Sequence, residues 1–197
     1  EVELTPADQW KTLGTNVPKV GAAQIVTGLH QYTSDLSRAG MLHAKVLRAP
    51  SFGAKLTSVD TSKAKAMAGV SVVEDGGFVA VAAPTVRLAV RALGAVTASW
   101  DEVEQPSHKD LEAVLRGDVK VAPSTKTADK TVRATYLANF IAHTPLEPRA
   151  ALAEWDGSTM TVHTGTQRPF GVRPEVATAL GLSEAQVRVI VPDTGSG

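Results

Sequence analysis

The stretch V-S-V-V-E-D-G-G-F-V-A-V-A, residues 70–82, decides the fold class of this chain. Its two ends, 70–73 and 78–82, have the apolar, valine-rich composition of β-strands. The four residues between them, 74–77, are acidic and glycine-containing, which is typical of a tight turn. We therefore predict an antiparallel hairpin with its turn at 74–77.

Segments on both sides of this hairpin complete an α+β unit. Strands are predicted at 41–48, 55–59 and 96–100. A helix is predicted at 61–68, where Asp60 can cap it and Gly69 ends it, and a second at 84–93, where apolar residues recur with helical spacing. Residues 28–104 are thus one α+β domain, preceded by an N-terminal extension, 1–27, that Trp10 and Leu13 are expected to anchor.

A second block is predicted at 131–197, after a linker at 105–130 that is polar, Thr-rich and interrupted by proline in its second half. A short helix at 107–116, capped by Ser107, is possible within the linker. The second block has strands at 132–137, 150–154, 160–164 and 187–191, a turn at Asp156-Gly157, and a helix at 169–180 closed by Gly181. Its roughly 65 residues are few for an independent core. We expect it to be incomplete and to be finished by further chain.

Composition excludes several classes of function. Twenty basic residues balance twenty acidic ones, so no net charge attracts nucleic acid. The chain has no cysteine, which excludes disulfides, an iron–sulfur cluster, a thiolate zinc site and a cysteine nucleophile within it. No apolar run approaches the ~18 residues of a membrane span. Localisation is left open, cytoplasmic or periplasmic.

His143 and Glu147 have the i, i+4 spacing that can place two metal ligands on one face of a helix. Pro145 and Pro148 disfavour a regular helix there. The main interpretation is therefore a rigid turn in which both side chains make structural hydrogen bonds, and a zinc pair is the minor one.

Two loops carry the best candidates for binding. Gln167, between a strand and a helix that starts with proline, can donate its amide hydrogens to an oxo or carbonyl oxygen, although a plain helix cap is the simpler interpretation. The final Gly195-Ser196-Gly197 can bring backbone N–H groups close to a phosphate or oxo group, or be a flexible turn. We predict no catalytic residue and no metal ligand within the chain.

Motifs spread over residues 8–197 resemble, in order and spacing, the xanthine dehydrogenase/aldehyde oxidase family of molybdenum hydroxylases. They are V-T-G at 26–28, G-M-L-H-A-K-V-L-R at 40–48, V-D-T-S-K-A at 59–64, H-x-P-L-E-P at 143–148, T-Q-x-P at 166–169 and T-G-S-G at 194–197. The resemblance implies an α/β-hammerhead domain at 28–104 and the first part of a molybdopterin-binding domain at 131–197. The short hammerhead is most similar to the isoquinoline 1-oxidoreductase-like branch.

The resemblance also implies roles for particular residues. Gln167 matches the family glutamine that hydrogen-bonds an oxygen ligand of molybdenum. Ser196 and Gly197 match the start of the glycine loop that lies against the cofactor, with Ser196 standing where many relatives have glycine. The family's catalytic glutamate lies downstream of that loop, and Glu147 does not take its place. The branch implies molybdopterin cytosine dinucleotide with molybdenum, and a partner subunit that carries iron–sulfur clusters.

Two functional hypotheses follow. The first is the N-terminal part or a split subunit of a molybdenum hydroxylase, which oxidises an N-heterocycle or aldehyde with water-derived oxygen. It would be inactive without the remainder of the large subunit and the iron–sulfur electron-transfer subunit. The alternative is a non-catalytic hammerhead module for assembly or binding. The first hypothesis requires the Gln167 loop and the closing glycine turn to meet as one wall of a cofactor pocket.

Overall fold

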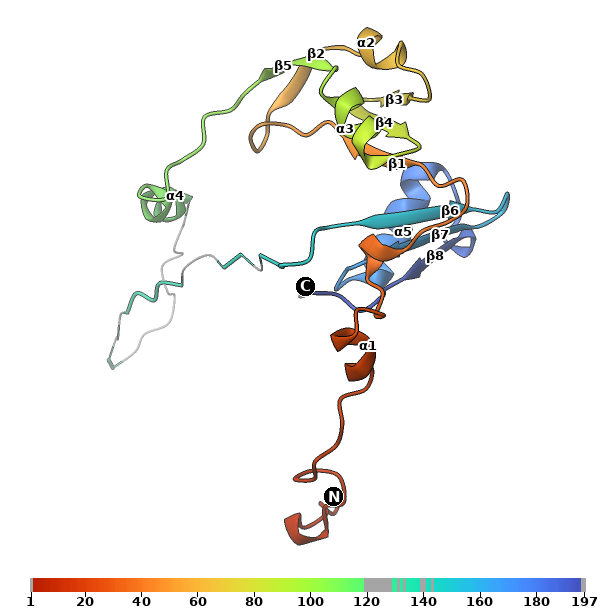
Figure 1. Ribbon diagram of the computed structural model, residues 1–197. Helices are drawn as coiled ribbons and strands as arrows, with labels where there is room; N and C mark the ends of the chain where they lie inside the picture. The colour runs from red at the N-terminus through yellow and green to blue at the C-terminus, as the bar shows by residue number, and fades with distance from the viewer. Residues whose placement is uncertain are drawn as a thin grey trace. The chain divides into compact units, whose positions relative to one another are not determined.

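The computed structural model describes residues 2–118, 129–130, 132, 134–138, 141–142 and 144–195, which form two compact units. The terminal unit combines residues 1–37 with 138–197, and the central unit comprises 38–137. Both contain helices and strands, so the predicted mixed α+β class is confirmed (Figure 1). The predicted domain boundaries at 27, 104 and 130 stay predictions, because compactness alone does not define a family domain.

The central unit contains two antiparallel sheets and short helices. Its elements are β1 (His43–Val46), β2 (Lys55–Asp60), α2 (Ser62–Lys65), β3 (Ser71–Asp75), β4 (Phe78–Ala83), α3 (Val86–Leu93), β5 (Thr97–Asp101) and α4 (Leu111–Asp118). One sheet has the order β1-β4-β3, and the other is the β2-β5 ribbon. The predicted strands at 41–48, 55–59 and 96–100 are thus confirmed, with ends shifted by a few residues.

Strand β4 is the middle strand of the larger sheet and pairs with a neighbour on each side. Val79, Val81 and Ala83 on this strand are at most 2% exposed. Because both of its edges are paired, the backbone polar groups of β4 need no water, and its apolar sequence can be buried. The hairpin predicted from residues 70–82 therefore forms the centre of this unit.

The hairpin turn is tighter than predicted. Glu74 and Asp75 belong to β3, and Asp75 pairs with Phe78, so the two strands are joined by Gly76 and Gly77 alone. These glycines have φ values of 51° and 92°. Two-residue hairpin turns favour positive φ, which glycine adopts without steric cost. The prediction of a four-residue turn at 74–77 is wrong because the two glycines suffice.

Helices α2 and α3 pack on this sheet through small residues. Ala64 of α2, Val81 of β4 and Ala92 of α3 have no exposed surface. An alanine at positions 64 and 92 lets each helix approach the sheet closely. Helix α3 begins after Thr85, whose Oγ1 accepts a hydrogen bond from the Leu88 N–H at 3.2 Å, as an N-cap does.

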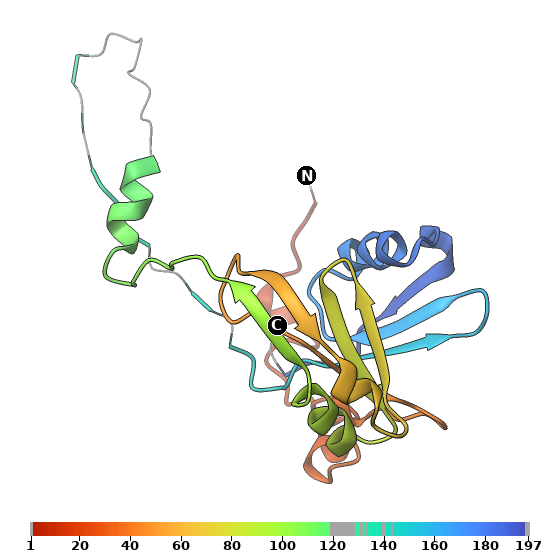
Figure 2. The ribbon, with the colours of Figure 1, turned by 90° about the horizontal axis from the view of Figure 1, so that it is seen from above.

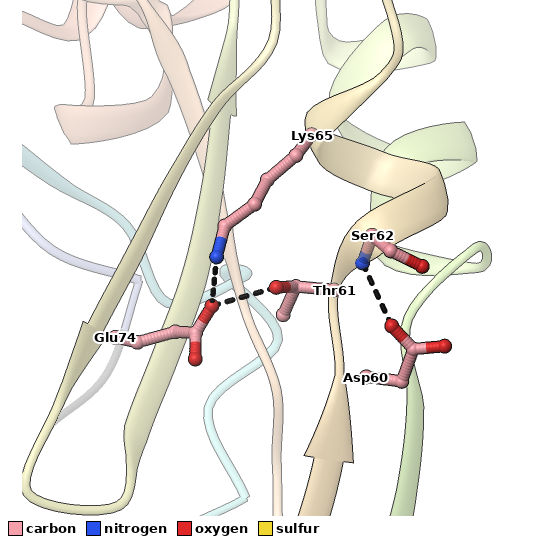
Figure 3. A network of polar contacts seen from close by, with 5 residues as sticks. All are labelled: Asp60, Thr61, Ser62, Lys65 and Glu74. Atoms are coloured by element: carbon pink, nitrogen blue, oxygen red, sulfur yellow. Dashed lines mark hydrogen bonds and ion pairs between the residues drawn. The ribbon is translucent and has the colours of Figure 1, made fainter.

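Glu74 links the start of α2 to β3 (Figure 3). Its Oε1 accepts hydrogen bonds from Lys65 Nζ at 2.7 Å and from Thr61 Oγ1 at 2.6 Å. These bonds, the one from Lys65 first, hold the pKa of Glu74 below its ordinary value. Next to them, Asp60 Oδ1 accepts a hydrogen bond from the Ser62 N–H at 2.9 Å. The N-cap position is Thr61 rather than the predicted Asp60, and Asp60 binds the first helical N–H from one residue further back.

Two predicted helices differ in length or position. Helix α2 ends at Lys65 rather than at 68, because the Met67 N–H bonds to the Ala64 carbonyl in a tight turn instead of continuing the helix. Helix α4 lies inside the predicted linker and begins at Leu111. Ser107 does not cap it, because its Oγ and carbonyl oxygen accept hydrogen bonds from Lys109 N and Asp110 N in a preceding turn.

The strand predicted at 132–137 is not formed at the described positions 132 and 134–137. Val132 and Tyr136 are 92% and 91% exposed. A strand needs a neighbouring edge for its backbone hydrogen bonds, and no described strand pairs with this segment. Most of the rest of the predicted linker, residues 119–128, lies outside the described residues.

The terminal unit has one three-stranded sheet with a helix over it (Figure 2). Its elements are η1 (Ala7–Gln9), α1 (Ala22–Val26), η2 (Thr33–Asp35), β6 (Ala151–Trp155), β7 (Met160–Thr164), α5 (Pro169–Leu180), η3 (Glu184–Gln186) and β8 (Val187–Ile190). Strands β6 and β7 are antiparallel, whereas β7 and β8 are parallel. Helix α5 makes the crossover between the parallel strands and packs on β8.

Local chemistry explains these elements. Asp156 Oδ1 accepts hydrogen bonds from the N–H groups of Thr159 and Ser158, which closes the β6–β7 loop and lowers the pKa of Asp156. Helix α5 starts at Pro169 and ends at Gly181, whose φ is 65°. The predicted helix at 169–180 and strands at 150–154, 160–164 and 187–191 are confirmed to within a residue or two.

The N-terminal helices η1 and α1 have no counterpart in the sequence predictions. Trp10 and Leu13, the expected anchors, are 50% and 68% exposed within this chain. Their anchoring role stays a prediction. Among the described helices, none combines the length and apolar character needed to cross a membrane.

We expect Val81→Ala to lower the free energy of unfolding by about 2 kcal/mol, because it leaves a cavity in the fully buried centre of β4. The matched control is Val73→Ala on the neighbouring strand, where the side chain is 49% exposed. It should cost less than about 1 kcal/mol. Urea unfolding monitored by circular dichroism measures both, and equal losses would contradict this description of the core.

Glu74 should make stability depend on pH. A carboxylate whose pKa is lowered by folding stabilises the fold above its unfolded pKa, and this contribution is lost as the pH falls through the folded pKa. Glu74→Gln should therefore be less stable than wild type near pH 7, and the difference should shrink towards about pH 3. Urea unfolding at several pH values measures it. Glu104→Gln, an exposed site with no hydrogen bond among the described residues, serves as the control.

Candidate functional site

The loop that carries Gln167 joins β7 to α5. Its backbone is shaped by Thr166, whose Oγ1 accepts a hydrogen bond from the Arg168 N–H at 3.0 Å. Arg168 precedes the helix and its Nη2 lies 3.1 Å from Glu175 Oε1. Gln167 is exposed, and no hydrogen bond engages its side chain among the residues that the structure describes. It does not cap α5, so its amide group is available for another acceptor.

This loop lies against the segment that follows β8. A methyl group added at Gly165 would lie 2.8 Å from Cγ2 of Thr194, so any larger residue there would force the Thr194 side chain to move. The contact follows from the topology. Because β7 and β8 are parallel, both strands end at the same edge of the sheet, and the loops that follow them emerge side by side.

Glu147 brings a third segment to the same place. Its Oε2 accepts a hydrogen bond from the Gly195 N–H. A methyl group added at Gly195 would lie 2.7 Å from Cβ of Glu147, so the two residues are in close contact. Thr144, at the start of this turn, has a φ of 38°, the left-handed region that non-glycine residues seldom adopt. The predicted structural hydrogen bond of Glu147 is thus observed.

The N-terminal segment is the fourth segment at this place and adds a third contact. His30 Nε2 lies 3.1 Å from Asp193 Oδ2, and the His30 ring meets Tyr32 edge-on with ring centroids 5.0 Å apart. The His30–Asp193 contact does not have hydrogen-bond geometry, so the buried Nε2 has no hydrogen-bond partner among the described atoms. The contact is therefore a short approach of two polar groups rather than a hydrogen bond.

An open hollow of about 560 Å³ lies beside these contacts. It is lined by Lys19, Val20, Ile25, Tyr32 and residues 191–194. Its wall therefore combines apolar side chains with one lysine and the carboxylate of Asp193.

The structure brings some of the predicted site residues together and leaves others outside the described residues. The Gln167 loop, Glu147 and Gly195 meet, whereas Ser196, Gly197 and His143 lie outside the described part. The binding roles of Gln167, Ser196 and Gly197 therefore stay predictions. Within the described residues, no group of three or more His, Cys, Asp or Glu side chains is placed to hold a metal ion.

Sequence reasoning missed His30, Asp193 and Gly165. Their contacts join positions far apart in the chain, and no local pattern marks them. Gly165 and Asp193 could have been found from the predicted topology, because they follow two strands that a crossover helix connects and that are therefore expected to be parallel. His30 lies in a segment with no predicted element.

Comparison with protein families gives one match over the second half of the chain. Residues 102–197 match the molybdopterin cofactor-binding domain. This range contains the Gln167 loop, Glu147 and the segment after β8.

Similar proteins match nearly the whole chain. The large molybdopterin subunit of nicotinate dehydrogenase from Eubacterium barkeri is 30% identical over 95% of this chain and 55% of that protein. The large subunit of nicotine 6-hydroxylase from Paenarthrobacter nicotinovorans is 26% identical over 94% of this chain and 30% of that protein. The chain thus spans about half of the first relative and about a third of the second.

A solved structure agrees with these matches. Quinoline 2-oxidoreductase from Pseudomonas putida 86 superposes with a TM-score of 0.69 at 25% identity, covering 95% of this chain and 31% of that one. The sequence and structure matches together cover both compact units. Residues 102–197 thus match a molybdopterin cofactor-binding domain, and over nearly its whole length the chain is similar to the molybdopterin-binding large subunits of the xanthine dehydrogenase/aldehyde oxidase family.

Proposed function

We propose that this chain supplies one wall of the molybdopterin site in a molybdenum hydroxylase that oxidises an N-heterocycle or an aldehyde. The observation that carries the proposal is the contact between Gly165 and Thr194, which joins the loop after β7 to the segment after β8. Both loops lie within the range that matches the molybdopterin cofactor-binding domain. Ligands of open sheets with parallel strands bind at this edge, beyond the carboxyl ends of the strands.

The donor chemistry of the loops fits the cofactor. Gln167 is exposed and its amide is not used within the described residues, so it can donate a hydrogen bond to an oxygen of the bound group without adding charge. Ser196 and Gly197 are small and allow close approach of the backbone. When bound, the cofactor supplies the redox chemistry of the hydroxylation. The chain's own residues would bind and orient it.

The metal does not need a ligand from this chain. In the proposed site molybdenum is held by the dithiolene of the pterin, which agrees with a chain that contains no cysteine. Gln167 would act from outside the metal's ligand set, as a group that orients a ligand by a hydrogen bond. We assign no catalytic residue to residues 1–197, and Glu147 is already engaged with Gly195.

We further propose the cytosine dinucleotide form of molybdopterin, iron–sulfur clusters on a partner subunit, and a substrate that is a small N-heterocycle. The names of the relatives support the substrate class, because nicotinate, nicotine and quinoline all contain a ring nitrogen. The thiolate ligands of such clusters would come from outside residues 1–197, which contain no cysteine. The remainder of the large subunit would supply the other walls.

The α/β-hammerhead assignment for residues 28–104 is part of the same proposal. It is supported by the small sheet β1-β4-β3 with α3 packed against β1 and β4. Large apolar side chains, such as Phe52 and Phe170, are 89% and 88% exposed in this chain, which favours burial against further protein. The same exposure would also suit a non-catalytic assembly module.

We expect the purified 197-residue chain to contain no stoichiometric molybdenum and to turn over no N-heterocycle, because the proposed site needs walls from other parts of the subunit. Metal analysis and a dye-reduction assay with nicotinate or quinoline measure this. A complete subunit made with its iron–sulfur partner should contain both molybdenum and activity. If the complete subunit bound no molybdenum, the non-catalytic assembly module would be favoured. If the 197-residue chain were active alone, the site would not need walls from other parts of the subunit.

Gln167→Ala in that complete enzyme should lower kcat by about 10- to 100-fold, the usual effect of losing a hydrogen bond to a metal's ligand. Thermal unfolding of the subunit should not change, because the side chain is exposed and makes no described contact. Gln9→Ala, at an exposed position in the N-terminal segment, is the control and should keep full activity. Unchanged turnover with Gln167→Ala would remove this residue from the site.

A further inference from the structure

Three consecutive residues after β8 are each held by a different segment of the terminal unit. Asp193 lies 3.1 Å from Nε2 of His30. Thr194 packs on Gly165. Gly195 donates its N–H to Glu147. We infer that Glu147 is a positioning residue, whose carboxylate fixes the backbone at Gly195 before the cofactor binds; this inference rests on the proposed function.

The contact of Glu147 has the strongest chemistry of the three. A carboxylate that accepts from a backbone N–H makes a charge-assisted hydrogen bond, which is roughly twice as strong as a neutral one. The Asp193 contact lacks hydrogen-bond geometry, and the Thr194 contact is apolar packing. Glu147 is also partly buried, which limits competition from water for its carboxylate.

The backbone of the turn around Glu147 has little conformational freedom, which suits it to position the carboxylate. Pro145 and Pro148 restrict the backbone on both sides of it, so little conformational freedom remains to be lost when the contact forms. The lack of a side chain at Gly195 permits this contact, because a Cβ atom at position 195 would lie 2.7 Å from Cβ of Glu147. The hydrogen bond joins residues 48 positions apart, so it fixes tertiary structure rather than a local turn.

This arrangement changes how the glycine turn can bind an anion. The Gly195 N–H is occupied by Glu147 and cannot also face a phosphate or oxo group. The donors for the cofactor must therefore come from other residues of the site. Glu147 would thus hold Gly195 without touching the cofactor, which separates its role from that of a catalytic glutamate.

The experiment measures backbone exchange in the 197-residue chain without cofactor. Hydrogen exchange at the Gly195 amide, resolved by NMR, should be on the order of tenfold faster in Glu147→Ala than in wild type, because the hydrogen bond to a charged group is lost. Glu147→Gln keeps a neutral acceptor oxygen of the same shape and should restore part of the protection. Glu184→Ala, an exposed glutamate of the same unit with no described side-chain contact, should leave the Gly195 amide unchanged.

Each outcome decides the inference. Faster exchange confined to residues 193–195, with unchanged exchange in β6 and β7, supports a positioning role. Equal exchange in wild type and Glu147→Ala overturns it, and so does a general loss of protection across the sheet, which would make Glu147 an ordinary structural residue. Because the chain is studied without cofactor, these failures leave the proposed function standing. That function fails instead when a complete subunit binds no molybdenum.

Discussion

The parallel pairing of β7 and β8 is the constraint on which the candidate site depends. Parallel strands cannot be joined by a hairpin, so a crossover is required, and α5 supplies it. Both strands then end at the same edge of the sheet. The Gln167 loop and the segment from 191 to 195 therefore emerge together, although they are separated along the chain by the whole of α5 and β8.

The contacts at this edge have different physical origins. Gly165 allows close approach by having no side chain, whereas Glu147 holds Gly195 by a hydrogen bond to a charged acceptor. His30 adds a short approach to Asp193 from the N-terminal segment. Residues 193–195 are thus contacted by three segments of the terminal unit.

The central unit has a different basis. Its stability depends on a small core of Ala64, Val81 and Ala92, and on the Glu74 hydrogen bonds that join α2 to β3. None of these residues belongs to the candidate site. Much of the apolar surface of both units is exposed, which is consistent with a chain that spans about half the length of its relative from Eubacterium barkeri.

Strong local signals were enough to predict several elements of this chain. Helix α5 is marked by Pro169 and Gly181, the β3–β4 hairpin by its two glycines, and the family by the order of its motifs. Element ends were less certain, as at α2 and α4, because competing turns of similar energy decide where a short helix begins and ends. Residues 132–137 have strand-like composition but form no strand at the described positions, since composition cannot supply a pairing edge.

Contacts between distant residues could not be predicted in this way, because they depend on the folded arrangement of the chain. Glu147 was recognised as a residue of a rigid turn, yet its partner, Gly195, lies 48 positions away and no local pattern connects them. The same is true of His30 with Asp193 and of Gly165 with Thr194. Local sequence controls backbone conformation through propensity and capping, whereas these contacts depend on how sheet pairing and the crossover helix bring separate loops to one edge.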